Sequence, residues 1–552
     1  MKKIIFLLLF LLPFTLETKG VLPQQIYIRV NQAGFLPWEI KTAIVLSNKN
    51  LDGKSFTLID ASSKIKVFSG QLQKSQQSGI DNFKFAYQIN FSGIKKSGEY
   101  FLSVEGKRSF DFQIGSNIYN AVVDSLMLFF KVQRCGYTDP MEHPVCHPDD
   151  ASRVISGNKV EMGKVDVTGG WHDAGDYVKF LNTAAITTYT LLFAYDFDPV
   201  RFGFDNNKNG VPDILEEAKV GLDWLIRLNY SKNKLITQVQ DMRDHDQGWR
   251  RPEADQLAND RPAFTGMGKN LIGIYTATMA IAARIWKDKL HYNEFSDKCL
   301  SLAKELFLIR YNVPDLDKSP SGMYQDSKYF GKLALGAIEL YNTTKYKDYL
   351  TEASELARKA GSDFWWSWGD INSFAHYRLA SIDPKFKEYI AANLKQFNDN
   401  KNKDLFGCAV QDGWGSNNAV LGAALQAILY RRLTSENTFD SLAVFQRDYI
   451  LGRNQWGVSF IQGIGSFYPR NFHSQVAYFN NGRLPGAVAS GAVTAKKFAD
   501  FKIKLSQTDR LKQFQTSRLV YHDDRNDFLT NEPTITTNAT ALFVMGFFSD
   551  RK

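Results

Sequence analysis

The spacing of apolar residues divides the chain into two regions of different period. From residue 26 to about residue 114, short apolar runs alternate with polar residues, and turn residues such as Asp52 and Gly53 separate the runs. Alternation at every second position is typical of strands with one buried face, and several short strands at this spacing indicate a β-sandwich. We therefore expect a β-sandwich domain over residues 22–115.

After Ser116 the apolar residues recur at intervals of three and four. This period predicts amphipathic helices, and counting the weaker segments gives about a dozen of them. A helical domain of this size is too large for one simple bundle, whereas pairs of helices closed into a toroid, an (α/α)6 barrel, fit the number. We expect this all-α barrel over residues 116–552, with functional residues on the loops at one end. The clearest helical segments are residues 121–132, 215–228, 271–286, 333–341, 350–360, 419–430 and 539–548.

Residues 1–20 have the pattern of a secretory signal peptide. Lys2 and Lys3 precede an apolar run, and Thr18 and Gly20 are small residues at positions suited to cleavage. The run is too short to span a membrane comfortably, and no cysteine follows it that could carry a lipid. We expect an exported protein, periplasmic or extracellular, with no membrane anchor.

The composition excludes one class of partner and leaves another open. The formal net charge is +9, but Lys and Arg are scattered among acidic residues, whereas a nucleic-acid-binding protein would gather them in a stripe or tail. We therefore expect no nucleic acid. Aromatic residues make up 14% of the chain, which suits either a large aromatic core or a groove lined with flat rings that bind sugars.

Two loops carry candidate catalytic carboxylates. Asp173 and Asp176 lie in the string GGWHDAGD, where small residues between them allow both carboxylates to point into one cavity and to deprotonate a water molecule. The same spacing also suits a turn whose aspartates cap a helix. Glu532 lies in an acidic loop before the last predicted helix. Burial and neighbouring carboxylates could keep it protonated, or it could simply complement the helix dipole.

A twelve-residue segment, 205–216, fits the pattern of a calcium-binding loop. Carboxylate and amide oxygens stand at the diagnostic positions, and Gly210 permits the sharp turn that such a loop needs. Pro212 argues against a helix–loop–helix pair, so we expect a lone structural site. The alternative is a polar turn leading into a helix. The candidate ligands are Asp205, Asn207, Asn209, Asp213 and Glu216.

Two cysteines and two histidines form a candidate zinc site, because two thiolates and two imidazoles make a closed tetrahedral set. The alternative is a Cys135–Cys146 disulfide, which is reasonable in an exported protein. His143 is a further candidate ligand. Cys299 and Cys408 lie far away in the sequence and are expected to be isolated core thiols, although they could also pair. The four candidate ligands are Cys135, Cys146, His147 and His172.

Taken together, these segments resemble glycoside hydrolase family 9, in the branch with an N-terminal immunoglobulin-like domain. The likeness covers nearly the whole chain after residue 20. Several long motifs in the family's order are a much stronger signal than any one of them. The segments that carry it are residues 29–37 (RVNQAGFLP), 169–176 (GGWHDAGD), 449–454 (YILGRN) with the residues up to 463, and 530–538 around Glu532.

The resemblance implies an immunoglobulin-like domain, an (α/α)6 barrel and hydrolysis of β-1,4-glucosidic bonds with inversion, as in an endoglucanase of the cellulase type. By this match Asp176 is the base, Asp173 helps to hold the attacking water, and Glu532 protonates the leaving oxygen. Inversion needs about 6.5–9.5 Å between the acid and the base. The resemblance also favours zinc over the disulfide, because the version of the base loop that carries His172 goes with a structural zinc, and calcium sites are common in the family.

The resemblance further implies substrate contacts at His245, Trp249 and His473. The chain departs from the family beside these positions. Ser474 and Gln475 stand where the family usually has a histidine and an arginine that would hydrogen-bond a sugar hydroxyl. Two further departures are Thr537 in place of an aromatic residue and the sequence Ala-Val-Ala at residues 487–489 in place of Gly-Pro-Asn.

These departures fall beside the expected sugar-binding cleft and not on the acid or the base, so three further functions stay open. They are an exo-acting β-glycosidase on oligosaccharides or amino sugars, a xyloglucan-type endoglucanase, and a carbohydrate-binding protein that has lost catalysis. The last would be expected to show a damaged acid or base, yet Asp173, Asp176 and Glu532 are all present. We expect a monomer whose partner is a polysaccharide or oligosaccharide.

Overall fold

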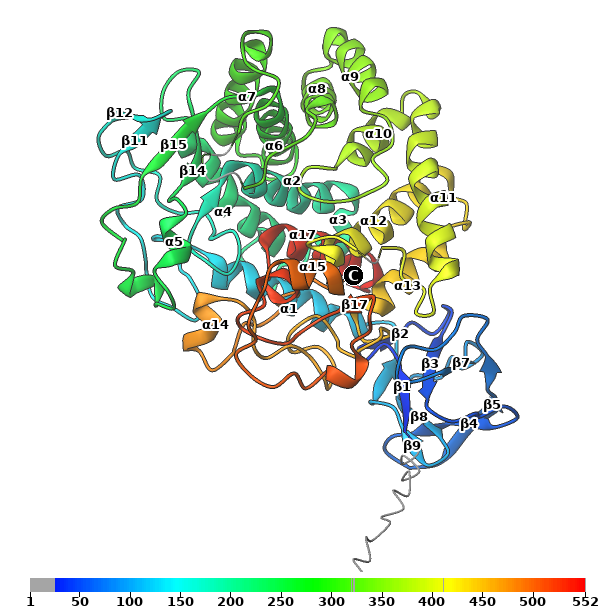
Figure 1. Cartoon of the computed structure of the whole chain (residues 1–552). Coiled ribbons are helices and arrows are strands. Elements are labelled where there is room, and N and C mark those ends of the chain that lie inside the picture. The colour runs from blue at the N-terminus through cyan, green and yellow to red at the C-terminus, as the bar shows by residue number, and fades with distance from the viewer. Residues whose placement is uncertain (1–24, 319, 321–322, 411, 552) are drawn as a thin grey trace, which may run out of the picture.

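The computed structural model describes residues 25–551 apart from 319, 321–322 and 411, so the predicted signal peptide lies outside the described residues. A strand-rich N-terminal region is followed by a helical one (Figure 1), and the predicted fold class is confirmed. Within the described ranges, no helix combines the length and the apolar character that crossing a membrane requires.

The N-terminal region is a sandwich of two sheets. Strand order is β1-β3-β7-β6 in one sheet and β2-β10-β8-β4-β5 in the other, with β9 on β8. Side chains from both sheets, such as Val45, Tyr87 and Leu102, meet in one core, which is why alternate positions of the strands are apolar. The strands are β1 (Ile26–Arg29), β2 (Gly34–Phe35), β3 (Thr42–Ser47), β4 (Ser55–Asp60), β5 (Lys66–Gln71), β6 (Gln73–Lys74), β7 (Phe85–Asn90), β8 (Gly98–Val104), β9 (Lys107–Arg108) and β10 (Phe112–Ile114).

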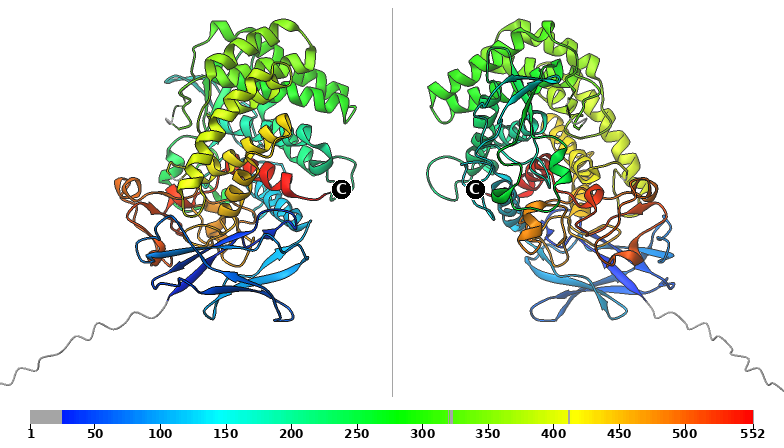
Figure 2. Two further views of the ribbon diagram at one scale, coloured as in Figure 1. Left: turned by 90° about the vertical axis from the view of Figure 1, so that its right-hand side faces the viewer. Right: turned by 60° about the vertical axis from the view of Figure 1, so that its left-hand side comes forward.

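Twelve described helices of nine or more residues alternate between an outer and an inner ring. Helices buried on nearly every face, such as α2 and α17, form the inner ring, and amphipathic helices such as α4 and α9 cover it. The last helix packs against the first, α1, and against α2, which closes the barrel (Figures 1 and 2). The outer helices are α1 (Ile118–Gln133), α4 (Asp213–Leu228), α7 (Asn293–Leu308), α9 (Lys347–Ala360), α11 (Lys387–Lys403) and α13 (Asp440–Ile450). The inner helices are α2 (Leu181–Phe197), α6 (Lys269–Asp288), α8 (Phe330–Thr344), α10 (Asn372–Ala380), α12 (Ser416–Thr434) and α17 (Ile535–Phe548).

Short strands and short helices lie in the segments between the barrel helices, and the periodicity of the sequence did not predict them. A five-stranded sheet has the order β12-β11-β15-β14-β13, and β16 pairs with β17 in the long segment between α13 and α17. The strands are β11 (Val154–Ser156), β12 (Lys159–Met162), β13 (Lys179–Phe180), β14 (Leu235–Val239), β15 (Ala263–Gly266), β16 (Val493–Thr494) and β17 (Leu519–Val520). The short helices are α3 (Pro199–Phe202), α5 (Arg243–Asp246), α14 (Gln475–Phe479), α15 (Ala495–Asp500) and α16 (Phe528–Asn531).

The sandwich is joined to the barrel by buried polar contacts. The Asn31 amide donates to the Asp448 carboxylate at 2.8 Å. Both Nη atoms of the buried Arg447 guanidinium donate to the Glu39 carboxylate at 2.8 and 2.7 Å. Because an unpaired buried charge is costly, these bonds fix how the two regions dock, and the segment 29–37 that resembles the family lies at their interface.

Candidate active site

The two loops with candidate catalytic residues meet at one end of the barrel. The base loop, residues 169–180, leads into α2, and Glu532 follows α16 just before α17. The peptide N–H of Gly175 donates to the Glu532 Oε1 atom at 3.1 Å, and the N–H of Ile535 donates to the Asp173 carbonyl at 3.0 Å. The predicted catalytic carboxylates are therefore brought together by two inner helices that are neighbours in the barrel.

The Asp176 carboxylate is held in its ionised form. It accepts a hydrogen bond from the Val178 N–H at 2.8 Å and lies 3.0 Å from the Nε2 atom of His245. Burial by itself would raise the pKa of Asp176, but the hydrogen bond and the positive charge of His245 outweigh burial and lower it. In return, Asp176 raises the pKa of His245 to about 9 against the effect of burial. An ionised carboxylate at this position suits a general base.

Asp173 is buried beside Asp176 and is held by two hydroxyl groups. It accepts hydrogen bonds from Thr183 and from Tyr324. Burial raises the pKa of Asp173 to about 7. The backbone of Tyr324 has φ of +50°, a conformation that is costly for a bulky residue and persists only where the surroundings enforce it. Nothing in the sequence around Tyr324 indicates a contact with Asp173, so this hydrogen bond was not predicted.

Glu532 is held as a protonated acid. Burial raises its pKa to about 8, the negative charge of Asp176 adds to the rise, and the hydrogen bond from Gly175 opposes it. A Cβ atom on Gly175 would lie 2.1 Å from the His473 carbonyl oxygen and 3.1 Å from Glu532 Oε1. Only glycine can therefore occupy this position. A protonated acid next to an ionised base is the division of roles that inverting hydrolysis requires.

His473 and Trp249, two predicted substrate contacts, pack against each other beside the catalytic loops. The Nδ1–H of His473 donates to the Arg525 carbonyl at 2.7 Å, which leaves Nε2 as the acceptor of the ring. The Trp249 ring meets His473 edge-on, at 5.4 Å between centroids, and stacks on Tyr478 at 4.9 Å. Because Tyr478 covers one face of Trp249, that face is closed to a sugar.

Other tryptophans of the chain separate into core and surface residues. Trp366 and Trp456 are fully buried and belong to the core. Trp414 is exposed and packs against Phe528, whose ring lies 5.9 Å from His473. Trp414 therefore extends the aromatic surface beside His473, which the sequence alone could not distinguish from core.

The four predicted zinc ligands converge in a buried cluster. The distances are 4.0 Å between the Cys135 and Cys146 sulfurs, 3.3 Å between the facing nitrogens of His147 and His172, and 3.7 and 3.8 Å for Cys135–His147 and Cys146–His172. Zinc bonds of about 2.3 Å to sulfur and about 2.0–2.1 Å to nitrogen give tetrahedral edges of about 3.8 Å and 3.4 Å. The donor set therefore fits zinc, and among the described residues it is the one group of three or more His, Cys, Asp or Glu side chains close enough together to hold a metal ion.

His143, the further candidate ligand, and a Cys135–Cys146 disulfide, the alternative to zinc, are not part of this cluster. His143 has its Nδ1 and Nε2 atoms at 2.8 and 3.0 Å from backbone carbonyls of Pro144 and Val132. The cysteine sulfurs are about twice as far apart as the ~2.05 Å of a disulfide. Cys299 and Cys408 are buried free thiols, as predicted for isolated core cysteines.

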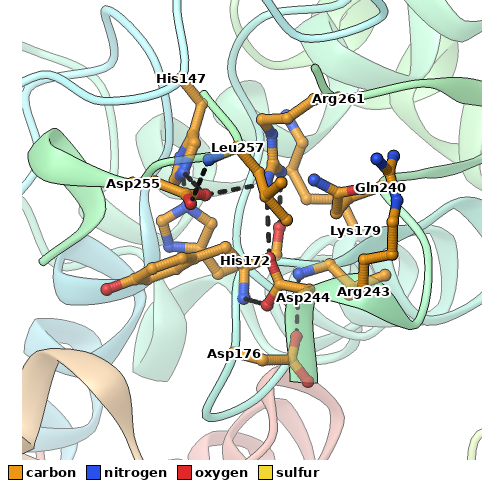
Figure 3. A network of polar contacts seen from close by, with 12 residues as sticks. His147, His172, Asp176, Lys179, Gln240, Arg243, Asp244, Asp255, Leu257 and Arg261 are labelled. Carbon is orange, nitrogen blue, oxygen red and sulfur yellow. Dashed lines mark hydrogen bonds and ion pairs between the residues drawn. The ribbon is translucent and has the colours of Figure 1, made fainter. Parts of the chain in front are cut away.

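A row of buried charges runs from the predicted zinc ligand His147 toward Asp176, the predicted base (Figure 3). The Nε2–H of His147 donates to Asp255 at 3.0 Å, and Arg250 donates to Asp255 at 2.6 Å and to Asp244 at 2.5 Å. Asp244 in turn accepts from the N–H of Tyr177, the neighbour of Asp176, at 3.0 Å. The metal cluster and the base loop are therefore parts of one hydrogen-bonded structure.

The predicted calcium loop is a tight turn that leads into α4, and its last residues, from Asp213 on, form the first turn of that helix. The Glu216 carboxylate meets the side chains of Asn207, at 3.0 Å, and Asn209. The Asp205 carboxylate accepts from the Gly210 N–H at 2.8 Å. Burial raises the pKa of Asp213, and the charge of Glu216 adds to the rise. Within the described residues, however, the three acidic side chains Asp205, Asp213 and Glu216 do not come close enough together to form a metal-sized cluster.

The sequence of this chain matches two family models and is similar to several known enzymes. Residues 119–545 match the family model described as glycosyl hydrolase family 9, and residues 24–109 match the cellulase N-terminal ig-like domain. Endoglucanase D of Acetivibrio thermocellus is 24% identical over 81% of this chain and 74% of its own. A cellodextrinase of Butyrivibrio fibrisolvens is 24% identical over 94% and 98%. A xyloglucan-specific endo-β-1,4-glucanase of Bacteroides ovatus is 23% identical over 93% and 92%.

Solved structures share the fold. A metagenome-derived family 9 endoglucanase superposes with a TM-score of 0.82 at 24% identity, covering 95% of this chain and 99% of the other. A zinc-binding triple mutant of the family 9 endoglucanase J30 superposes with a TM-score of 0.78 at 23% identity, covering 94% and 100%. These likenesses establish the arrangement of a sandwich followed by an (α/α)6 barrel.

Proposed function

This chain belongs to glycosyl hydrolase family 9 and is a glycoside hydrolase of the cellulase type, and from that premise we propose that it hydrolyses β-1,4-glucosidic bonds with inversion, using Asp176 as base and Glu532 as acid. These roles are supported by the position of both carboxylates at Gly175, whose N–H donates to Glu532 and whose neighbour in the chain is Asp176, together with opposite shifts of their pKa values. The pKa of Asp176 is lowered, whereas burial raises that of Glu532 to about 8.

The proposed reaction moves two protons. Asp176 takes a proton from water as the water oxygen forms a bond to the anomeric carbon. The bond from that carbon to the leaving oxygen breaks, and Glu532 gives its proton to this oxygen. Asp173, fixed by Thr183 and Tyr324, helps to hold the same water. After the reaction Asp176 is protonated and Glu532 is ionised, so proton exchange with solvent restores both groups.

We propose a β-1,4-glucan as the substrate, with His245, Trp249 and His473 among its contacts. The sequence relatives named above, an endoglucanase, a cellodextrinase and a xyloglucan-specific endoglucanase, span the range of expected substrates. The departures at 474 and 475 leave the cleft without the cation expected there. The Ser474 hydroxyl caps α14, and the Gln475 side chain is bonded to backbone atoms of residues 248–250.

Hydrolysis of a glucan panel tests the function. We expect the purified protein to release reducing sugar from one or more of carboxymethyl-cellulose, mixed-linkage glucan, xyloglucan, cello-oligosaccharides and chitosan oligomers. Activity on xyloglucan alone would favour the xyloglucan-type enzyme, and terminal release from short oligomers or chitosan would favour the exo-acting one. Binding to these sugars without cleavage of any would contradict a catalytic role.

We further propose two structural metal sites. Cys135, Cys146, His147 and His172 would hold zinc, and Asp205, Asn207, Asn209, Asp213 and Glu216 would hold calcium. Bound zinc would supply cross-linking of the chain beside the base loop rather than a reactive position, because four protein ligands close its coordination. Asp255, which accepts from His147, is the kind of second partner that orients a ligating histidine.

Metal analysis of the purified protein is expected to find about one zinc per chain, together with calcium. Cys135→Ser combined with Cys146→Ser should remove the zinc and destabilise the fold by several kcal/mol, since metal affinity contributes directly to folding. Thermal unfolding and elemental analysis measure both effects. Cys299→Ser, a buried thiol outside the cluster, is the control and should keep the zinc. An oxidised Cys135–Cys146 pair without zinc would support the disulfide instead.

The remaining features of the proposal concern the whole chain. We propose export to the periplasm or the extracellular space after removal of residues 1–20, and a monomeric enzyme. We also propose that residues 22–115 and 116–552 are the two domains. The strands of the sandwich end at Ile114 and the first helix begins at Ile118, which supports a boundary between the two regions.

A further inference from the structure

The backbone of Gly175 is hydrogen-bonded on both sides, once to the acid loop and once to a third segment. Its N–H donates to Glu532 Oε1 at 3.1 Å, and its carbonyl accepts from the N–H of Gln475 at 2.8 Å. Asp176 is the next residue along the chain. Residue 475 therefore fixes the Gly175 backbone, and with it both the N–H that donates to Glu532 and the starting point of the next residue, Asp176.

Residue 475 is held in turn by its own side chain. The Gln475 Oε1 atom accepts from the Arg250 N–H at 2.8 Å, and Nε2 donates to the Gly248 carbonyl at 3.2 Å. Segment 248–250 is tied to the base loop as well, because the Tyr177 hydroxyl donates to the Arg250 carbonyl at 2.7 Å. Gln475 is almost fully buried, so its amide is committed to this bracing and not to a sugar.

We propose that Gln475 is a positioning residue, which clamps the Gly175 peptide so that its N–H stays on Glu532 and Asp176 keeps its distance from the acid. The proposal rests on the roles proposed above for Asp176 and Glu532. It assigns a function to a departure from the family pattern. Where an arginine would be expected to bind substrate, this chain has an amide that joins three loops.

The pH dependence of kcat distinguishes a residue that positions the Gly175 peptide from a residue that only stabilises the fold. Glu532 faces Asp176, Asp173, His245 and Tyr324, and the N–H of Gly175 is the one hydrogen bond that favours its ionised form among those contacts. Losing a donor to a carboxylate raises its pKa. Loosening the Gly175 peptide should therefore move the loss of activity at alkaline pH to a higher pH, whereas general destabilisation would lower activity without moving it.

Two substitutions separate the contributions of the side chain and the backbone. Gln475→Ala removes the amide bonds to residues 248–250. Gln475→Pro also removes the N–H that Gly175 accepts from, and proline suits the first position of a helix, which residue 475 occupies in α14 after the extended Ser474. The kcat of each is measured against pH on a soluble β-1,4-glucan, with circular dichroism to confirm folding.

In Gln475→Ala we expect the alkaline limb, the decline of kcat at high pH, to move to a higher pH by about half to one pH unit, and in Gln475→Pro to move further. In both variants kcat should fall roughly tenfold or more, with KM little changed. Ser474→Ala is the matched control. It loses the hydroxyl that caps α14, so it should melt earlier with its limb unmoved. An unmoved limb in a folded Gln475→Ala variant overturns the clamp. If the proline variant does not fold, the alanine variant alone decides.

A failure of the proposed function would be recognised separately. If the wild-type limb persists in Glu532→Gln, then Glu532 does not set it, and the assignment of the acid is wrong whatever the Gln475 variants do. If the wild-type limb depends on Glu532 but stays fixed in both Gln475 variants, the acid stands and only the clamp is rejected.

Discussion

Asp176→Asn is expected to lower the kcat for β-glucan hydrolysis by roughly 10²–10⁴-fold, the usual contribution of a general base. Asparagine keeps the shape of the side chain and can still accept the Val178 N–H, but it cannot take a proton from water. It also removes the negative charge that raises the pKa of His245. The measurement is steady-state release of reducing sugar.

The control for this variant lies in the same region. Asp246, in α5 beside His245, is exposed, and Asp246→Asn should retain most of the activity. Circular dichroism and thermal unfolding should show that both variants are folded. Near-wild-type kcat in a folded Asp176→Asn protein would rule out Asp176 as the base and direct attention to Asp173.

Glu532→Gln is expected to produce a loss that depends on the leaving group. With a natural glucan, the leaving sugar oxygen needs a proton, and kcat should fall by roughly 10²–10⁴-fold. With an aryl glycoside such as 2,4-dinitrophenyl β-cellobioside, the leaving group departs as a stable anion, so the loss should be much smaller. A direct comparison of the two substrates separates an acid from a residue that only binds sugar.

The pH dependence of the wild type follows from the same residue. Glu532 can act as an acid only while it is protonated, and burial raises its pKa to about 8. Activity on the glucan should therefore hold through neutral pH and decline as the pH rises through about 8. The decline should be absent from the aryl glycoside activity of Glu532→Gln. Equal losses on both substrates, with the decline retained, would contradict the role of acid.

The fold could be predicted because its signals are local and periodic. Each helix expected from the spacing of apolar residues is present, usually with one to four more residues at its ends, as in α12 and α8. Most of the added residues are polar and lie in the first or last turn of a helix, where they carry little periodic signal. The sheet of β11 to β15 was missed because its strands are two to five residues long, which is too short for an alternating pattern.

The candidate site was predictable only in part, for a related reason. Asp173, Asp176 and Glu532 occur in long motifs, so the resemblance identified them together. Tyr324 and Gln475 were not identified as partners of these loops, because their contacts join segments that are far apart in the chain. Nothing near Gln475 indicates that its amide reaches Arg250, and only the folded structure shows that bond.

The contact between Gly175 and Glu532 also determines when this enzyme can become active during its synthesis. The two residues are 357 positions apart in the chain, and the helix that follows Glu532 closes the barrel against α1 and α2. A growing chain has its base loop long before it has an acid, and domains fold as units as they emerge from the ribosome. The nascent protein therefore remains inactive until its last helix is made and docked.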